Sequence, residues 1–126
     1  MPLIVAPTKV LIAPISAQPQ FTPIVRRLSS RLRALGITNT IDASSASIGK
    51  RYARNDELGT PLGITIDFDT VADGSITLRE RDSMTQVRGS EDEVLRAVTN
   101  LVFGTESWDQ ITQYLTAFSA QGHDND

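Results

Sequence analysis

The chain has 126 residues, a net charge of −3 and no cysteine. These values favour one globular domain and exclude a disulfide scaffold, thiolate zinc sites and a cysteine nucleophile. No apolar run approaches the length of a membrane span, and no basic stretch precedes an apolar one at the start, so we expect neither a membrane partner nor a signal peptide. The absence of cysteine fits a reducing compartment.

The charges are distributed unevenly along the chain. Residues 1–54 contain eight of the twelve Lys and Arg and a single acid, Asp42, whereas residues 55–126 contain four bases and fourteen acids. The two parts therefore carry +7 and −10. Such asymmetry is typical of a local anion-binding face on an acidic protein. Two helices with solvated arginine faces would give the same counts.

The first predicted elements are a buried strand and a helix. Lys9–Pro14 is a short apolar run that ends at a proline, which predicts a strand. Thr22 and Pro23 then predict a helix start, with Thr22 as the N-cap. Apolar residues recur at helical spacing up to Leu35, and Gly36 predicts the end. A solvated surface is the favoured interpretation of the four arginines on the other faces of this helix, Arg26, Arg27, Arg31 and Arg33.

The middle of the chain predicts four more elements. Ile37–Ile41 predicts a strand, and Ser47 predicts the N-cap of a helix from Ile48 to Leu58. Leu62–Phe68 alternates apolar and polar residues, which predicts a strand with Phe68 on its apolar face. Asp73-Gly74 predicts a tight turn before the hairpin partner 76–79, and a further strand is predicted over 84–88.

Two helices are predicted near the C-terminal end. Ser90 and Glu93 form a capping-box pattern, and Ser107 and Gln110 repeat it before a helix that extends to Phe118. The alternation of strands and helices in the first half implies parallel pairing, and the hairpin adds antiparallel strands. We therefore predict an α/β fold of three layers, with helices on both faces of a mixed five-stranded sheet.

One basic motif could bind an anion. Ser47-Ile48-Gly49-Lys50-Arg51 lacks the first glycine of a phosphate loop and the Ser or Thr that would follow its lysine, so we reject nucleotide binding. The segment still places Lys50, Arg51 and Arg54 on the first two turns of a helix, beside amides that suit an anion. A capped surface helix whose arginines pair with nearby acids explains the pattern equally well.

No catalytic centre can be assembled from these residues. The only histidine, His123, lies in the polar tail, so a general-base or metal role is not expected. Asp67 and Asp69 offer too few ligands for a dedicated magnesium site. The alternation Arg79-Glu80-Arg81-Asp82 is more typical of a salt-bridged surface than of an acid–base pair. We expect no catalytic residue, metal or cofactor in this chain.

The stretch Ser44–Asp69 resembles the central signature of eukaryotic-type glycyl-tRNA synthetases, which are class II aminoacyl-tRNA synthetases. The similar parts are SIGKRYAR (47–54), DE-x-G (56–59) and TIDFD (65–69), and TLRERDSMTQV (77–87) follows. The chain departs from the family pattern at Lys50, where arginine is more frequent, and at Asn55, where threonine is more frequent. The resemblance implies a class II anticodon-binding domain over residues 5–120, with flexible ends at 1–4 and 121–126.

The resemblance also implies partners and a location. The family's catalytic domain, with its ATP, magnesium and glycine sites, would lie upstream and is absent from these residues. The expected partners are the anticodon loop of glycine tRNA and the catalytic domain of the same chain, in a homodimeric parent enzyme. The expected location is the cytoplasm, with mitochondria as a second compartment.

Unpaired anticodon bases can be stacked on side chains and read on their edges. By resemblance, the candidates for anticodon contact are Asp67, Phe68, Asp69, Thr70, Arg79, Arg81 and Asp82, and those for the RNA backbone are Lys50, Arg51 and Arg54. The resemblance also implies that the anticodons concerned share two central cytosines, and acids and arginines would match the donors and acceptors of cytosine. Arg79 is the main candidate for base specificity, and pairing with Asp67 or Glu80 across the hairpin is the structural alternative.

Two other functions remain open. The accessory subunit of mitochondrial DNA polymerase carries a similar domain that acts as a protein partner, although the close resemblance over 47–69 disfavours it. A free-standing enzyme would need an activity that depends on Asp67 or Asp69.

Overall fold

The computed structural model describes residues 7–44 and 46–118. Its elements in chain order are β1 (Val10–Pro14), the 3-10 turn η2 (Pro19–Phe21), α1 (Thr22–Ala34), β2 (Asn39–Ile41), α2 (Ile48–Glu57), β3 (Leu62–Ile66), α3 (Phe68–Asp73), β4 (Ser75–Glu80), β5 (Thr85–Ser90), α4 (Glu91–Phe103), α5 (Trp108–Ile111) and β6 (Thr116–Ala117). The predicted flexible ends and His123 lie outside the described residues. No helix in these two ranges is long and apolar enough to cross a membrane.

The strands of the described residues form one mixed sheet in the order β2-β1-β3-β4-β5-β6. β1 pairs in parallel with both β2 and β3, and the pairs β3–β4, β4–β5 and β5–β6 are antiparallel. Crossovers through α1 and α2 produce the parallel pairs, and short connections produce the pairs β3–β4 and β4–β5. The chain passes through α4 and α5 before β6 pairs with β5. The predicted mixed sheet is confirmed, with one strand more than expected.

The additional strand, β6, replaces part of a predicted helix. Trp108, Ile111, Leu115 and Phe118 have helical spacing, but α5 ends at Ile111 and the chain then extends along β5. Leu115 is still part of the core, and the amide of Phe118 donates to the carbonyl of Gln86 at 2.9 Å. This pairing satisfies backbone groups at the edge of β5, and it outweighs the local periodicity.

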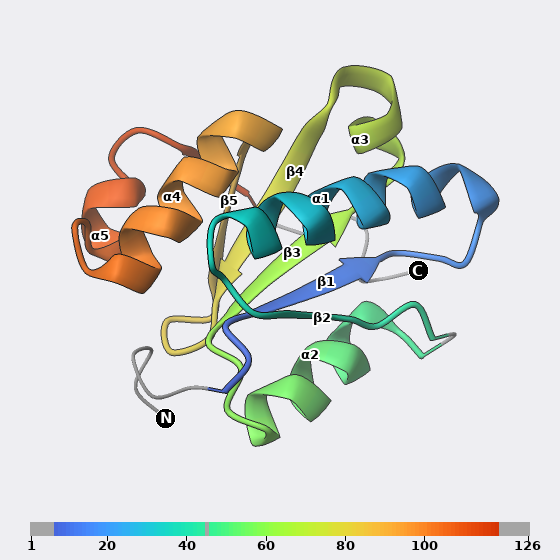
Figure 1. Ribbon diagram of the computed structural model, residues 1–126, viewed down its shortest axis with the longest axis horizontal. Helices are drawn as coiled ribbons and strands as arrows, with labels where there is room; N and C mark the ends of the chain where they lie inside the picture. Colours follow the sequence, from blue (N-terminus) through green and yellow to red (C-terminus); the bar gives the residue numbers. More distant parts are fainter. Residues whose placement is uncertain (1–6, 45, 119–126) are drawn as a thin grey trace.

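Helices cover the two faces of the sheet unequally (Figure 1). α1 and α4 pack on one face and bury the larger apolar core, while α2 packs on the other face against β1. Alternation divides the side chains of β1 between the two layers. Val10 and Ile12 belong to the larger core, whereas Leu11 and Ala13 lie with Tyr52 of α2. The predicted three-layer α/β/α arrangement is confirmed.

Serine N-caps begin three of the helices, as predicted. The side chains of Ser47, Ser90 and Ser107 each accept a hydrogen bond from the amide three residues later, which satisfies a backbone donor that the first turn leaves unpaired. Thr22 differs from its prediction. It is the first residue of α1 and not the N-cap, because the 3-10 turn Pro19–Phe21 leads directly into the helix.

A short helix connects β3 and β4, where we predict a continuous strand and a tight turn. β3 ends at Ile66, and Asp67 is the N-cap of α3, whose last residue precedes the left-handed Gly74 (φ 79°). Asp67 and Thr70 form a capping box that satisfies the first amides of this helix. The alternating pattern is therefore misleading at Phe68, which begins α3 and does not continue the strand.

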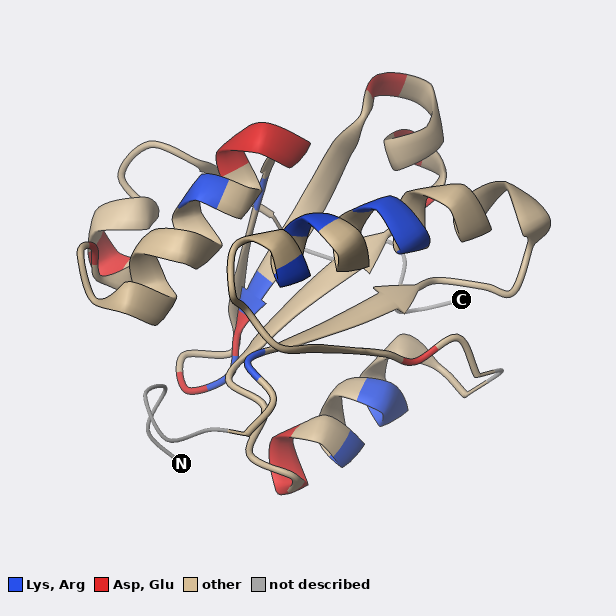
Figure 2. Ribbon diagram, viewed as in Figure 1, with Lys and Arg blue, Asp and Glu red and all other residues tan. Residues whose placement is uncertain are grey.

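Arginines of α1 pair with acids at the start of α4, and Figure 2 shows the basic positions of α1 and the acidic first turn of α4 on the ribbon. Arg27 and Arg31 each lie 2.7 Å from a carboxylate oxygen of Glu91, and Arg31 also lies 2.9 Å from Asp92. Acids at this end of α4 are favoured by the helix dipole as well. Two of the four arginines of α1 therefore join the helices to each other, which supports a structural role for them.

Tyr52 of α2 lies directly on Gly63 of β3. Its hydroxyl shares a hydrogen bond of 2.6 Å with Oγ1 of Thr65, and a Cβ atom at position 63 would overlap the tyrosine ring. The helix approaches the sheet this closely because residue 63 has no side chain.

We predict that Gly63→Ala lowers the free energy of unfolding by about 1–3 kcal/mol, because the ring of Tyr52 would have to leave a well-packed position. Gly49→Ala is the matched control, since nothing lies within 4 Å of its added Cβ and alanine favours a helix. Urea unfolding should give a lower midpoint for Gly63→Ala only. Equal midpoints for the two variants would contradict the close contact.

Candidate functional site

Part of one sheet face is covered by none of the described helices. Among the described helices only α2 lies on that side (Figure 1), where it packs against β1. Because Ile76, Leu78 and Val87 belong to the core on the other side, the alternate positions of β4 and β5 face away from it. We term this side of β4 and β5 the open sheet face; its residues are Arg79, Gln86, Arg88 and Phe118, together with Thr65 and Thr77, which are buried beneath neighbouring side chains.

Arg79 is held between an aromatic ring and a carboxylate. Its Cζ lies 4.6 Å from the centre of the Tyr52 ring, and two of its nitrogens donate to Asp56 at 3.1 and 3.2 Å. Burial raises the pKa of Tyr52 to about 12, so this ring is neutral at physiological pH. The ion-pair partner of Arg79 is therefore Asp56 of α2, and not Asp67 or Glu80. Three of its five N–H groups have no acceptor among the described residues.

Arg88, which the sequence interpretation does not select, connects β5 to the start of α3. It donates two hydrogen bonds of 2.8 Å to the carboxylate of Asp67, one to Thr77, and two to the side chain and carbonyl of Ser75. All five of its N–H groups are thus used. Its Cζ also lies 5.3 Å from the centre of the Phe118 ring.

Asp67 is both the N-cap of α3 and the ion-pair partner of Arg88. Its carboxylate accepts hydrogen bonds from the amide and hydroxyl of Thr70 as well as from the guanidinium. Burial alone would raise the pKa of Asp67, but the hydrogen bonds and charge of Arg88, with the contribution of Thr70, lower it below the ordinary value. Asp67 and Thr70 are therefore occupied in holding α3 in place.

The other candidates of this segment are accessible. Phe68 is 49% exposed and packs against Phe21, with ring centroids 5.2 Å apart, while Asp69 is exposed in the first turn of α3. The aromatic face and the carboxylate could contact a ligand without rearrangement. No group of three or more His, Asp or Glu side chains in the described ranges could hold a metal ion.

Arg81 and Asp82 lie at the far end of β4 from Asp67. They belong to the turn between β4 and β5, where Nε of Arg81 lies 3.1 Å from the carboxylate of Asp82 and its amide donates to the carbonyl of Pro61. A strand of six residues is about 20 Å long. The structure therefore brings Asp67, Phe68, Asp69 and Thr70 together, and places Arg81 and Asp82, with Arg79 near them, at the opposite end.

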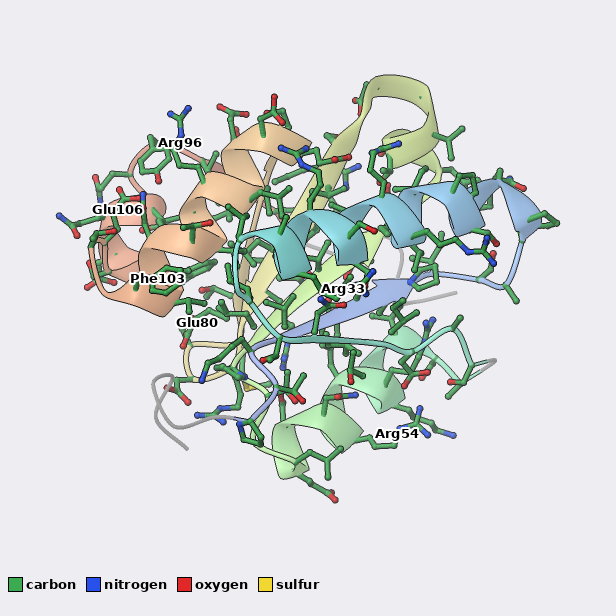
Figure 3. The ribbon with its side chains drawn as sticks, viewed as in Figure 1. Arg33, Arg54, Glu80, Arg96, Phe103 and Glu106 are labelled. Atoms are coloured by element: carbon green, nitrogen blue, oxygen red, sulfur yellow. The ribbon has the colours of Figure 1, made fainter. Side chains whose placement is uncertain are left out.

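The basic residues of α2 divide into two kinds. Lys50 is exposed, and Arg54 is on the outer surface of the helix (Figure 3), with its side chain 53% exposed and 2.7 Å from Asp42. Arg51 is 1% exposed. Its guanidinium donates to four backbone carbonyls, those of Pro14, Ile15, Asp42 and Ala46.

The prediction that Arg51 contacts the RNA backbone is therefore wrong for this structure. A buried guanidinium that is bonded to four carbonyls cannot reach a phosphate, and it instead joins the end of β1 to the loop before α2. Lys50 and Arg54 remain accessible to an anion.

Residues 9–101 match the family model described as "Anticodon binding domain". The chain belongs to the anticodon binding domain family. It is 51% identical over 120 residues to "Glycine--tRNA ligase 1, mitochondrial" of Saccharomyces cerevisiae, covering 95% of this chain and 17% of that protein. It is 49% identical over 113 residues to "Glycine--tRNA ligase 2" of the same yeast, covering 88% and 18%. This anticodon binding domain thus spans less than a fifth of the length of these relatives.

Solved structures share the fold. The domain superposes on the RNA binding domain of threonyl-tRNA synthetase from Cryptosporidium parvum with a TM-score of 0.72 and 21% identity, over 82% of this chain and 26% of that one. It superposes on prolyl-tRNA synthetase of the same organism with a TM-score of 0.69 and 23% identity, over 82% and 24%. These matches confirm the predicted class of α/β fold.

The first prediction from the site concerns Arg51. Arg51→Gln should lower the free energy of unfolding by about 2–4 kcal/mol, because it leaves several buried carbonyls without their charged donor. Lys50→Gln removes the same charge from the neighbouring exposed position and should change stability by less than about 0.5 kcal/mol. Denaturant titrations compare the two, and similar losses would show that Arg51 is not a structural residue.

The second concerns pH. Because the folded-state pKa of Asp67 lies below its unfolded value, its ion pair stabilises the domain above the ordinary carboxylate pKa of about 4, and this contribution is lost as the pH falls through the folded-state pKa. Asp67→Asn should therefore be less stable than the wild type at pH 7 and lose less stability between about pH 5 and pH 2. Asp69→Asn removes the exposed neighbouring carboxylate, which forms no ion pair with Arg88, and it should cost less stability at pH 7 than Asp67→Asn.

Proposed function

We propose that this chain is the anticodon-binding domain of a glycine–tRNA ligase and recognises the anticodon of glycine tRNA during ATP-dependent aminoacylation by the full-length enzyme. The observation that carries the proposal is the 51% identity over 95% of this chain with a yeast protein of that name. Because the chain corresponds to 17% of that relative, ATP, magnesium and the catalytic groups would belong to the remaining part. The comparisons give no support to the polymerase accessory subunit.

The proposed RNA contacts fall into two classes. Lys50 and Arg54 would neutralise phosphates, since both are exposed cations on the first turns of α2. Phe68 would stack on an unpaired base, and Arg79 would donate to a base edge through N–H groups that Asp56 does not use. The exposed carboxylates Asp69 and Asp82, the latter beside Arg81, could accept from cytosine amino groups. Asp67 and Thr70 would act indirectly, by placing Phe68 and Asp69.

The further partners of the parent enzyme belong to the same proposal. The catalytic domain of the same chain would bind the acceptor end of the tRNA, and a second copy would complete a homodimer. The cytoplasm would be the main location, and the mitochondrial name of one yeast relative supports mitochondria as a second one.

We predict that the chain binds an RNA hairpin with the glycine anticodon loop more tightly than a hairpin in which guanines replace the two central cytosines. Arg79→Ala should remove about 1–3 kcal/mol of this preference, because a donor to a base edge is lost. Lys50→Ala and Arg54→Ala should weaken binding of both hairpins alike and reduce its salt dependence, because phosphate contacts carry no sequence information.

Arg96→Ala is the matched control for charge. Arg96 is exposed on α4 (Figure 3), in the helical layer on the opposite face of the sheet. Filter binding or fluorescence anisotropy at two salt concentrations would compare the variants. If Arg96→Ala weakened binding as much as Lys50→Ala or Arg54→Ala, the affinity would depend on net charge alone, and the assigned RNA surface would be incorrect.

A further inference from the structure

Gln86 occupies the middle of the open sheet face. It lies on β5 directly opposite Arg79 of β4, and on its other edge its carbonyl accepts from the amide of Phe118. Residues that are opposite in antiparallel strands point to the same face, with Cβ atoms about 5 Å apart. The half-buried side chain of Gln86 is therefore the neighbour of the Arg79 side chain on this face.

The other polar groups of this face already have partners. Thr65 bonds to Tyr52, Thr77 accepts from Arg88, and every N–H of Arg88 is donated. The side-chain amide of Gln86, in contrast, forms no hydrogen bond with any described residue. An amide has two donors and an acceptor, so this position combines both kinds of group with the remaining donors of Arg79.

We propose that Gln86 reads the Watson–Crick edge of an unpaired pyrimidine together with Arg79. This rests on the proposed function, for which the base would be one of the two central cytosines of the glycine anticodon. Oε1 of Gln86 accepts from the cytosine amino group, its Nε2 donates to N3, and Arg79 donates to O2. The protein thus supplies one acceptor followed by two donors, which is the complement of the cytosine edge.

The same pair of side chains disfavours purines. Guanine presents an amino group where cytosine presents O2, so it would place a donor against the donors of Arg79, and adenine presents a C–H there. Rotation of the amide by half a turn exchanges its donor and acceptor, so Gln86 alone would accept uracil as well as cytosine. Selection of a pyrimidine therefore requires Arg79 in a fixed position, which Tyr52 and Asp56 provide.

Gln86→Met tests the proposal, because it keeps the length of the side chain and removes its hydrogen-bonding groups. Binding of the glycine anticodon hairpin by the 126-residue chain should weaken about tenfold, as expected when base-edge hydrogen bonds are lost. The preference for cytosine over guanine should decrease at one of the two central positions and persist at the other. Gln113→Met makes the same chemical change at an exposed residue after α5 and should leave both quantities unchanged.

A second probe isolates the contact itself. A hairpin with pyrimidin-2-one in place of the affected cytosine lacks the amino group that Oε1 of Gln86 accepts from. If that contact exists, Gln86→Met should weaken this modified hairpin less than the natural one. The thermal midpoint of Gln86→Met should stay near that of the wild type, since no hydrogen bond between described residues is removed.

The outcomes separate the two proposals. If the wild type shows no preference for the central cytosines, the proposed function fails, and this inference fails with it. If the wild type and Arg79→Ala behave as predicted but Gln86→Met keeps full affinity and preference, only the role of Gln86 is overturned. A large fall in the thermal midpoint of Gln86→Met, with equal losses of affinity for all hairpins, would make Gln86 a structural residue and would also overturn its proposed role. Gln86→Ala, whose side chain is too small to overfill the site, would repeat the comparison of thermal midpoint and affinity.

Discussion

The guanidinium of Arg88 joins parts of the chain that are distant in sequence, namely β5, the N-cap of α3 and the residue that follows β6. Its double hydrogen bond to Asp67 is the central contact, because the same carboxylate caps α3. The orientation of Phe68 and Asp69 at the start of α3 therefore depends on a side chain of β5, which lies two strands from β3 in the sheet. A ligand that contacts α3 meets side chains already fixed by packing and hydrogen bonds, which reduces the entropy lost on binding.

Unequal coverage of the sheet determines where charged side chains can lie. Tyr52 fits against Gly63 and so brings α2 down onto β1 and β3. The helix ends at Glu57, and no other described helix continues this layer over β4 and β5. Tyr52 marks the boundary: on one side it covers apolar residues, and on the other its ring supports Arg79. The side chain of Arg79 is 11% exposed at that boundary and keeps N–H groups that Asp56 does not use, and donors without a protein acceptor are satisfied by a polar partner.

The parts of the fold that depend on local patterns could be predicted, and those that depend on distant partners could not. Serine caps and parallel strands follow from short segments. The pairing of Arg79 with Asp56 joins α2 to β4, and no local pattern contains it. Arg51 is a different case, because Ile48, Arg51, Tyr52 and Asn55 follow the i, i+3, i+4, i+7 spacing of a buried helix face. That spacing distinguishes Arg51, on the buried face, from the exposed Lys50. Because arginine is rarely buried, the charge of Arg51 predicts a surface position, and this prediction is wrong.

The position of β1 has a consequence for synthesis of the chain. This strand is the first of the described strands, yet it lies between β2 and β3 and all five of its residues are buried. At roughly 5–20 residues per second, about 3–10 s pass between the synthesis of β1 and that of β3. During that interval an apolar strand has one unpaired edge and incomplete helical cover, which is the state in which nascent chains associate with each other or with chaperones. Within the segment from β3 to β5, by contrast, each strand pairs with the next one in sequence, so these two pairings can form as soon as the segment is made.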